Sequence, residues 1–430
     1  MKLDTFNTIL LIILVASSLV LTAYVWTFQP NSLRSDQLVT EEPQTLNGTE
    51  KQLADILRPQ HIYVHNNNNH FVFADKDEEQ SFEEELSEWT LTNTKKTSLD
   101  ELPATSIELV YPVAVSYSQL NALFQVEGAE DVISNLGDGV FNRVYMAPSE
   151  DTQTATIIFI NERQEDPLEG AVTATVTKNV YNFIQEDNLI SAVPLTDKYA
   201  WNQIYLPTSI QVNDSNVRSE TISRNAFLDI YMEEPSERGP DQFIDTNRLK
   251  SVQFRNNGQV ASYNYLNSST GRTGTISRAD QLQAAIHAIN SHKGWTNDFN
   301  LYAVSGEGST NFQFRMVRNG YPVFQMNGLS LLSIRMESKM PDPVSYERTL
   351  LHLSETGKSD GAVTLEAQDV LNWLDENQLN KRDIQDVTIG YTLDENDASS
   401  IYRYHMRPSW FVKISGEWDE VESGNMGGES

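Results

Sequence analysis

Histidine is the first side chain whose type and spacing suggest chemistry here, because a neutral imidazole binds zinc and titrates near neutral pH. His61, His65 and His70 lie close together in the sequence and would meet across a β-hairpin. Their spacing matches no established zinc motif, and a hairpin that exposes histidines needs no metal. The other four histidines have no partner at a useful spacing: His287, His292, His352 and His405. We therefore predict no metal ligand and no cofactor.

Signatures of other catalytic machinery are also missing from the sequence. Without cysteine, the chain forms no disulfide and no thiolate metal site, and it has no cysteine nucleophile. No Gly-x-Ser-x-Gly elbow occurs. Gly306-Glu307-Gly308 resembles part of a phosphate loop, but the following lysine is absent and Glu307 would repel phosphate, so we expect a turn between strands. We predict no catalytic residue, and hence a binding or regulatory protein rather than an enzyme.

The charge of the chain excludes one class of partner. There are 60 acidic and 31 basic residues, giving a formal net charge of −29. Such a surface repels nucleic acid, which is bound through patches of Lys and Arg. Hydrophobic residues make up 39% of the 430 residues, which is enough apolar surface for folded cores. At roughly 100–200 residues per domain, two or three domains are expected.

The N-terminal segment has the composition of a membrane helix. Residues Ile9 to Phe28 are uncharged and mostly apolar, and as a helix they would span a bilayer core of about 30 Å. A cleaved signal peptide is the alternative, but its apolar run is shorter. Tyr24, Trp26 and Phe28 would form an interfacial aromatic belt. Lys2 favours a cytoplasmic N-terminus, so we expect a single-pass protein of the cell membrane with its bulk outside the cytoplasm.

Within this expected helix, Ser18 and Thr22 lie one turn apart. Small or hydroxylated residues at that spacing let a second membrane helix approach closely. Both hydroxyls could instead bond to carbonyls of the preceding turn. We predict Ser18 and Thr22 as the contact face for a partner helix.

The periodicity of the remaining chain predicts an α+β fold in several domains. An Asn-rich turn at residues 66–69 predicts a hairpin, and residues 75–88 predict an acidic amphipathic helix. Residues 226–232 look strand-like, whereas helices are expected from Ser277 and from Thr364, each followed by an antiparallel meander. The predicted divisions are a cytoplasmic tip (1–8), the transmembrane helix (9–28), a linker (29–45), an N-terminal α+β domain (46–188), a middle β-rich domain (189–277), a C-terminal α+β domain of two similar helix-plus-antiparallel-sheet units (278–416) and a loose acidic tail (417–430).

Short motifs spread over the whole chain resemble the YycH family. Each motif alone is weak, but their order and spacing are specific. The resemblance lies in the opening Lys2 to Trp26, Thr27-Phe28-Gln29-Pro30, Arg58-Pro59-Gln60-His61-Ile62, Tyr205-Leu206-Pro207, Gly320-Tyr321-Pro322-Val323-Phe324 and Arg407-Pro408-Ser409-Trp410.

The resemblance implies a function that composition alone does not. Proteins of the YycH family regulate the WalK–WalR (YycG–YycF) two-component system of cell-wall metabolism, acting on the sensor histidine kinase WalK together with YycI, a second single-pass membrane protein. The family's membrane helix is thought to contact the kinase, which would make Ile9 to Phe28 the effector element. We therefore expect a non-catalytic regulator in an extracytoplasmic partner complex. The alternatives are a cell-surface protein that binds wall material or a ligand and, less favoured, a wall-polymer enzyme.

Overall fold

The computed structural model describes residues 45–422 except 151–152, 186–187, 197–201, 267–275, 307–308, 326–327, 339, 341, 357–360 and 397–402. The expected membrane helix Ile9 to Phe28 therefore lies outside the described residues. Among the helices that are described, none is both long enough and apolar enough to cross a bilayer.

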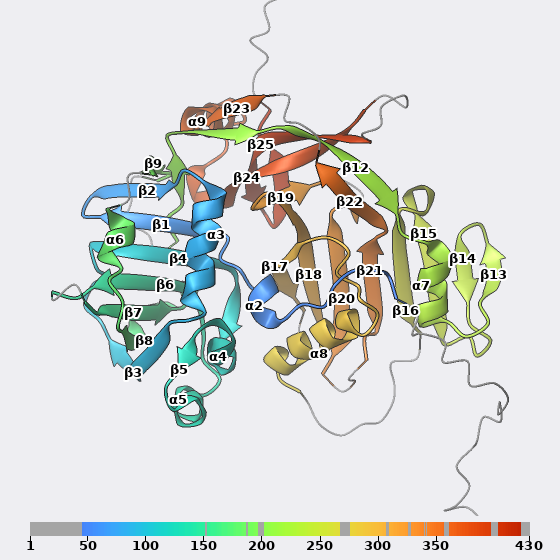
Figure 1. Ribbon diagram of the computed structural model, residues 1–430, viewed down its shortest axis with the longest axis horizontal. Helices are drawn as coiled ribbons and strands as arrows, with labels where there is room; N and C mark the ends of the chain where they lie inside the picture. Colours follow the sequence, from blue (N-terminus) through green and yellow to red (C-terminus); the bar gives the residue numbers. More distant parts are fainter. Residues whose placement is uncertain are drawn as a thin grey trace, which may run out of the picture. The chain divides into compact units, whose positions relative to one another are not determined.

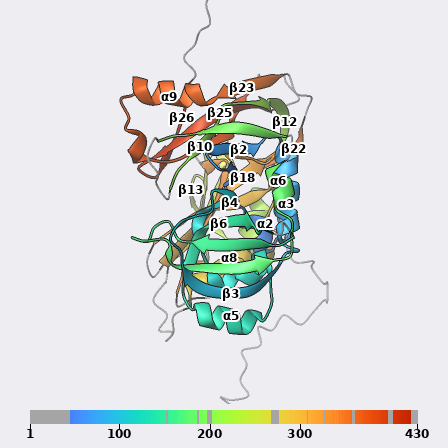
Figure 2. The same cartoon turned by 90° about the vertical axis from the view of Figure 1, so that its left-hand side faces the viewer.

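A ten-stranded sheet contains the N-terminal half of the described chain, at the left of Figure 1. Its strands are mostly antiparallel, and its longest strand alternates buried and half-buried residues along one end. Figure 2 looks at this sheet from the left-hand side of Figure 1. In spatial order the strands are β10 (Tyr205–Pro207), β9 (Leu189–Pro194), β2 (Asn69–Phe73), β1 (His61–Asn66), β4 (Thr105–Ser116), β6 (Val140–Pro148), β7 (Ala155–Ile160), β8 (Glu169–Val176), β3 (Thr90–Ser98) and β5 (Gln125–Val126).

The predicted hairpin is confirmed in β1 and β2. His65 pairs with His70 and Asn66 with Asn69, so the turn falls on the Asn run. Asn67 has φ of 55°, a left-handed conformation that Asn tolerates better than most residues. The register places His65 and His70 opposite each other, and it places His61 at the far end of β1.

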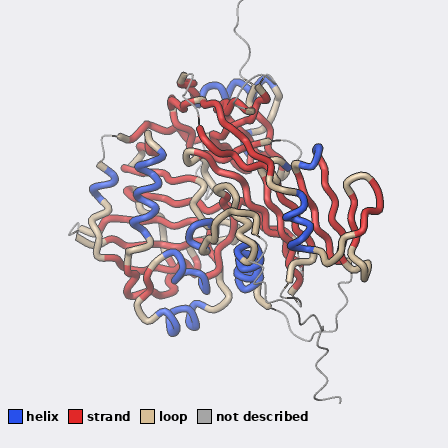
Figure 3. Tube along the Cα trace, turned by 45° about the vertical axis from the view of Figure 1, so that its right-hand side comes forward, coloured by secondary structure: helices blue, strands red, loops and turns tan. Residues whose placement is uncertain are grey.

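A second, fourteen-stranded sheet holds most of the C-terminal half. Strands dominate the chain here, as the red tube in Figure 3 shows. Its main path is β13 (Ser236–Gly239), β14 (Gln242–Ile244), β15 (Lys250–Arg255), β16 (Val260–Tyr265), β21 (Ser345–Thr349), β20 (Leu331–Glu337), β18 (Ser309–Arg318), β19 (Tyr321–Phe324), β24 (Ile384–Glu395), β25 (Tyr404–Ile414), β12 (Ser215–Thr221) and β22 (Leu351–Thr356), with β17 (Phe299–Ser305) on β18 and β26 (Glu417–Glu420) on β25.

Helices pack on these sheets through buried apolar side chains. The predicted acidic helix is confirmed as α3, which begins where the Asp75 carboxylate accepts a hydrogen bond from the Asp77 backbone N–H. It packs on β2 and buries Phe82 and Leu86. The helices and helical turns are α2 (Leu53–Ile56), α3 (Lys76–Leu86), α4 (Leu120–Leu123), α5 (Ala129–Leu136), α6 (Tyr181–Ile184), α7 (Arg224–Tyr231), α8 (Arg278–Asn290), α9 (Ala367–Glu376), η1 (Tyr117–Gln119), η2 (Asn256–Gly258) and η4 (Lys381–Asp383).

Both expected helices exist, and the strands that follow each of them join the same sheet. The helix expected from Ser277 is confirmed as α8, capped by the Ser277 side chain and packed on β18 and β20. The second helix, α9, starts at Ala367 rather than at Thr364. Residues 362–366 instead form β23 (Ala362–Glu366), because they pair with β11 (Ser209–Asn213) in a separate two-stranded sheet.

Two expectations were wrong. Residues 226–231 lie in α7 instead of a strand. Ser223 caps this helix, and Phe227 and Leu228 are its buried residues. The tail is not loose from residue 417, because residues 417–420 form β26 and pair with β25. In both segments, apolar side chains pack into the core, and the local sequence pattern does not predict this. Val421, for example, is buried.

The strands of the expected middle domain are divided between the two sheets. Within residues 189–277, β9 and β10 extend the first sheet, while β12 to β16 belong to the second. Residues 44–430 form one compact unit, in which β4 packs against β17 and Thr49 bridges to Trp295. The domain boundaries stay predictions, but the hydrogen bonding of the sheets crosses the one at 189.

Candidate functional site

A cluster of charged side chains lies buried on the first sheet, centred on Glu108. The Glu108 carboxylate accepts hydrogen bonds from His65 Nε2 at 2.8 Å and from the Tyr145 hydroxyl at 2.7 Å. Arg143 on β6 forms ion pairs with both Glu108 and Glu162. Antiparallel pairing of β4 with β1 and β6 brings these residues together, since Glu108 lies opposite Tyr145.

The cluster keeps Glu108 ionised. Burial raises the pKa of Glu108, but the charge of Arg143 and the hydrogen bond from His65 outweigh burial and hold the pKa at about 2. A buried carboxylate with this environment is paired rather than poised to transfer a proton at neutral pH. The cluster is therefore a structural ion network and not a general acid.

The two histidines of the hairpin contact each other instead of converging on a metal. His65 Nδ1 lies 2.8 Å from His70 Nδ1. When His65 donates from Nε2 to Glu108, a neutral pair is completed by His70 donating from Nδ1 to the His65 ring. The Tyr205 ring covers His70 at 4.3 Å between centroids. Burial and the neighbouring His65 lower the pKa of His70.

His61 is separated from this pair and joins the two sheets. Its Nε2 lies 2.7 Å from a carboxylate oxygen of Asp386, on β24, and the Gln60 amide donates to the other oxygen at 2.6 Å. The three histidines that sequence spacing grouped thus have two different roles. Within the described part of the chain, no group of three or more His, Cys, Asp or Glu side chains could hold a metal ion.

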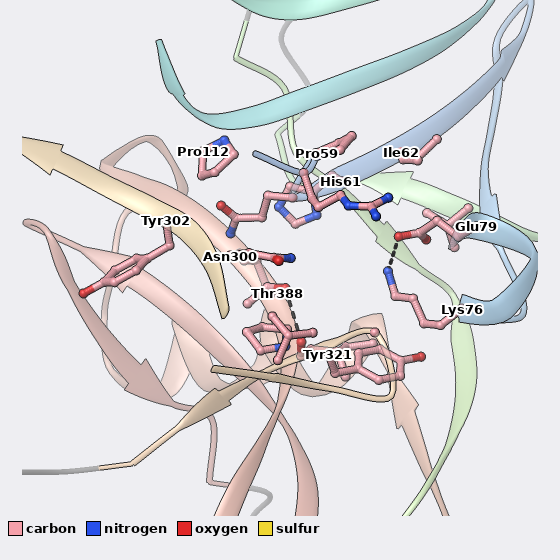
Figure 4. A pocket seen from close by; sticks show the side chains of 18 of the residues that line it. Pro59, His61, Ile62, Lys76, Glu79, Pro112, Asn300, Tyr302, Tyr321 and Thr388 are labelled. Carbon is pink, nitrogen blue, oxygen red and sulfur yellow. Dashed lines mark hydrogen bonds and ion pairs between the residues drawn. The ribbon is translucent and has the colours of Figure 1, made fainter. Parts of the chain in front are cut away.

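A cavity of about 130 Å³ lies between the two sheets, next to His61. Figure 4 shows its walls: Pro59, His61, Ile62 and Pro112 lie on one side, and Tyr302, Tyr321 and Thr388 lie on the other. The first wall comes from β4 and the chain around the start of β1, and the second from β17, β19 and β24. Apolar and aromatic side chains make up most of its wall.

Most charged groups in the cavity wall have a carboxylate partner. Arg58 pairs with Glu83 at 3.1 Å, and Lys76 pairs with Glu79 in the contact dashed in Figure 4. Arg315 differs from them. Its guanidinium lies between the rings of Tyr302 and Phe324, 4.3 and 4.2 Å from their centroids.

The other histidines have separate environments. His292 is buried beside Arg348, and burial together with that positive charge lowers its pKa to about 3. His287 lies on α8, where its side chain is exposed. His352 contacts the Thr296 carbonyl, and His405 lies 3.2 Å from Asp214. None of these arrangements resembles a ligand set.

Of the remaining sequence predictions, the described residues reach only the turn at Gly306. Gly306 directly follows β17 and has φ of 95°, which suits the predicted turn, while Glu307 and Gly308 lie outside the described residues. The predicted membrane contact residues Ser18 and Thr22, and the predicted interfacial anchors, stay predictions for the same reason. Those anchors are Tyr24, Trp26 and Phe28.

The fold and site define a class: a strand-rich α+β protein of two large sheets that share a core and enclose a small cavity. Family models match the chain over residues 4–188 (YycH protein, N-terminal domain) and 202–426 (YycH protein, C-terminal domain). A curated relative from Bacillus subtilis (strain 168), "Two-component system WalR/WalK regulatory protein YycH", is 20% identical over 97% of this chain and 96% of its own length. The solved structure of YycH from Bacillus subtilis superimposes with a TM-score of 0.68 at 13% identity, over 87% of this chain and 98% of that one.

The chain belongs to the YycH family. The two matched models together cover nearly all of it. The curated relative is a regulatory protein of a two-component system, and the solved structure shows that the fold is shared.

Proposed function

We propose that this protein is a non-catalytic, membrane-anchored regulator of a sensor histidine kinase that controls cell-wall metabolism. The observation that carries the proposal is the full-length relationship to a relative named as a WalR/WalK regulatory protein. The kinase is expected to be WalK, and a YycI-like single-pass protein is expected to join the complex, as the family resemblance implies.

The proposed anchor is the apolar run Ile9 to Phe28, with the N-terminus in the cytoplasm and the bulk of the chain outside it. Support comes from composition: the run has no charged residue over a length that matches the bilayer core. Tyr24, Trp26 and Phe28 suit the interface that ends such a helix.

The proposed mechanism needs no chemistry from this chain. A kinase with two conformations a few kcal/mol apart shifts toward the one that a bound partner prefers. Contacts between membrane helices contribute about 1–2 kcal/mol, enough to change the kinase output severalfold. We propose that Ser18 and Thr22 form the face of the helix that makes these contacts. The folded part would hold the partner complex together and position the helix.

A segment exchange tests this mechanism. Replacing residues 9–28 by an unrelated membrane helix keeps the anchor and removes its specific face. We expect regulation of a WalR-dependent promoter to fall to the level of a deletion strain while the protein stays in the membrane. A narrower variant replaces only Ser18 and Thr22 by leucine in the native helix, and it should lose much of the regulation. Full regulation by the exchanged protein would rule out the helix-contact mechanism.

The alternative is a surface protein that binds wall material or a small ligand. One observation favours a ligand: the cavity between the two sheets. It does not conflict with regulation, because a ligand that prefers one arrangement of the two sheets would bias the same equilibrium.

A further inference from the structure

We propose that the cavity between the two sheets binds a small organic acid, with the carboxylate paired to Arg315 and an aryl or short alkyl body packed on the aromatic wall. The inference concerns a ligand site, and it does not depend on the proposed kinase partner.

Arg315 is the first observation. Its described acceptors are the Val323 carbonyl, at 3.3 Å, and the Tyr302 side chain. No carboxylate among the described residues pairs with it, and burial lowers the pKa of its guanidinium. A guanidinium carries five N–H donors in a planar fork that matches a carboxylate, so a donor pair is available for an anionic ligand.

A second buried arginine shows how this fold satisfies the group when no ligand is needed. Arg348 is fully buried, and its three nitrogens donate to the Thr349 carbonyl, the Gly294 carbonyl and the Thr296 hydroxyl. Arg315 has no comparable set of oxygen acceptors. Its aromatic neighbours hold the guanidinium in place by stacking but leave most of its N–H groups to other partners.

The indole groups of the same wall are the second, independent observation. Trp410, on β25, and Trp418, on β26, both line the cavity. The indole nitrogen of each is buried, and no acceptor among the described residues lies within hydrogen-bond distance of either. A buried donor without a partner costs about 1–3 kcal/mol, so a ligand acceptor that either indole reaches by rotating toward the cavity would recover part of that cost.

These groups lie close together. The Phe324 ring is 4.2 Å from the Arg315 guanidinium and 5.1 Å from the Trp418 ring. Arg315 is therefore a cation that aromatic rings of this wall surround.

The volume of the cavity limits the size of the ligand. The cavity volume is about 130 Å³, close to the engineered cavity of about 150 Å³ that accommodates benzene. Phosphate alone would fit, but it would leave the aromatic wall without contact. A benzoate-sized acid pairs with the cation and packs on the apolar surface, and its carboxylate supplies acceptors for the indole donors. Figure 4 shows Tyr302, Tyr321 and Thr388 on the wall where such a body would lie.

The test is calorimetric titration of the purified full-length protein in lipid nanodiscs with benzoate, benzamide, acetate and inorganic phosphate. Benzoate should bind about tenfold or more tightly than benzamide, its neutral isostere, because a charge-assisted pair contributes more than a neutral hydrogen bond. Acetate and phosphate should bind more weakly than benzoate. Equal binding of benzoate and benzamide, no binding of either, or tighter binding of phosphate would overturn the proposal.

Variants locate the site. Arg315→Met keeps the length and apolar stem of the side chain and should weaken benzoate binding about tenfold or more while weakening benzamide binding much less. Arg335→Met, an exposed position on β20 away from the cavity, is the control and should bind as the native protein does. Trp418→Phe keeps the ring and removes the N–H, and should weaken benzoate binding severalfold. If Arg315→Met does not fold, Trp418→Phe decides: native affinity in that variant refutes the site.

Discussion

Removing Arg143 should be the most damaging single change in the first sheet, because it leaves Glu108 buried without its cation. Arg143 and Glu108 are both almost completely buried. Breaking a buried pair by removing one partner costs about 3–5 kcal/mol. Independently, the difference between the ordinary Glu pKa of 4.5 and about 2 in this protein corresponds to about 3 kcal/mol of stabilisation of the carboxylate.

The loss should depend on pH in a defined direction. In native protein the depressed pKa of Glu108 contributes stability that is present above pH 4.5 and is lost as the pH falls toward 2. In Arg143→Met, burial dominates and raises the pKa of Glu108, so the carboxyl group escapes its penalty by binding a proton. The difference in stability between the variant and the native protein should therefore be largest at alkaline pH and should shrink as the pH falls toward 2.

Urea unfolding measures both effects as shifts of the midpoint at constant slope. Arg255→Met is the control, because it breaks an ion pair with Glu347 whose side chains are 46% and 41% exposed and should cost less than about 1 kcal/mol. Adding Glu108→Gln to Arg143→Met should recover at least about 1 kcal/mol by removing the unpaired charge. A double variant that is less stable than Arg143→Met would refute the reasoning.

Two further predictions concern packing and acid stability. His292 has a pKa lowered from 6.5 to about 3, first by burial and then by Arg348, so native stability should fall by up to about 1.4 kcal/mol per pH unit as the pH drops from 6.5 toward 3. His292→Gln should flatten that part of the urea-midpoint profile, and an unchanged slope would assign the acid loss to other groups. Gly390→Ala should cost about 1–3 kcal/mol, since a Cβ there would lie 2.6 Å from the Phe324 ring and 2.6 Å from the Pro322 carbonyl. Gly239→Ala has open space around it and should change stability by less than about 0.5 kcal/mol in the same urea unfolding experiment. Equal losses of stability in the two variants would contradict the packing argument.

Local signals predicted the elements whose pattern and turn chemistry agree. The Asn run fixed the hairpin, because Asn67 accepts the left-handed backbone that the turn needs. Asp75 and Ser277 are capping residues, and they indicated where α3 and α8 begin. The strand prediction for residues 226–232 was wrong because Phe227 and Leu228 are equally compatible with a strand. Only the Ser223 cap indicates the helix α7.

The site depended on pairings that are distant in sequence. Glu108 stands in the apolar run Ile107-Glu108-Leu109, which is a signal for a buried charge, but nothing local identifies Arg143 as its partner. His61 reaches Asp386 across 325 positions. The cavity is likewise formed by strands from both halves of the chain, so the spacing of residues along the sequence does not predict it.

The most direct test of the regulatory account is photo-crosslinking from Ser18 in the tagged full-length protein within its native membranes, followed by mass spectrometry of the captured proteins. A crosslinker at Leu19, which faces a different side of the expected helix, provides the control. The account predicts that the position-18 probe captures a sensor histidine kinase, at a much higher yield than the position-19 probe. Capture without any kinase, or equal capture from both positions, would contradict the proposal that this protein regulates a kinase through one face of its membrane helix.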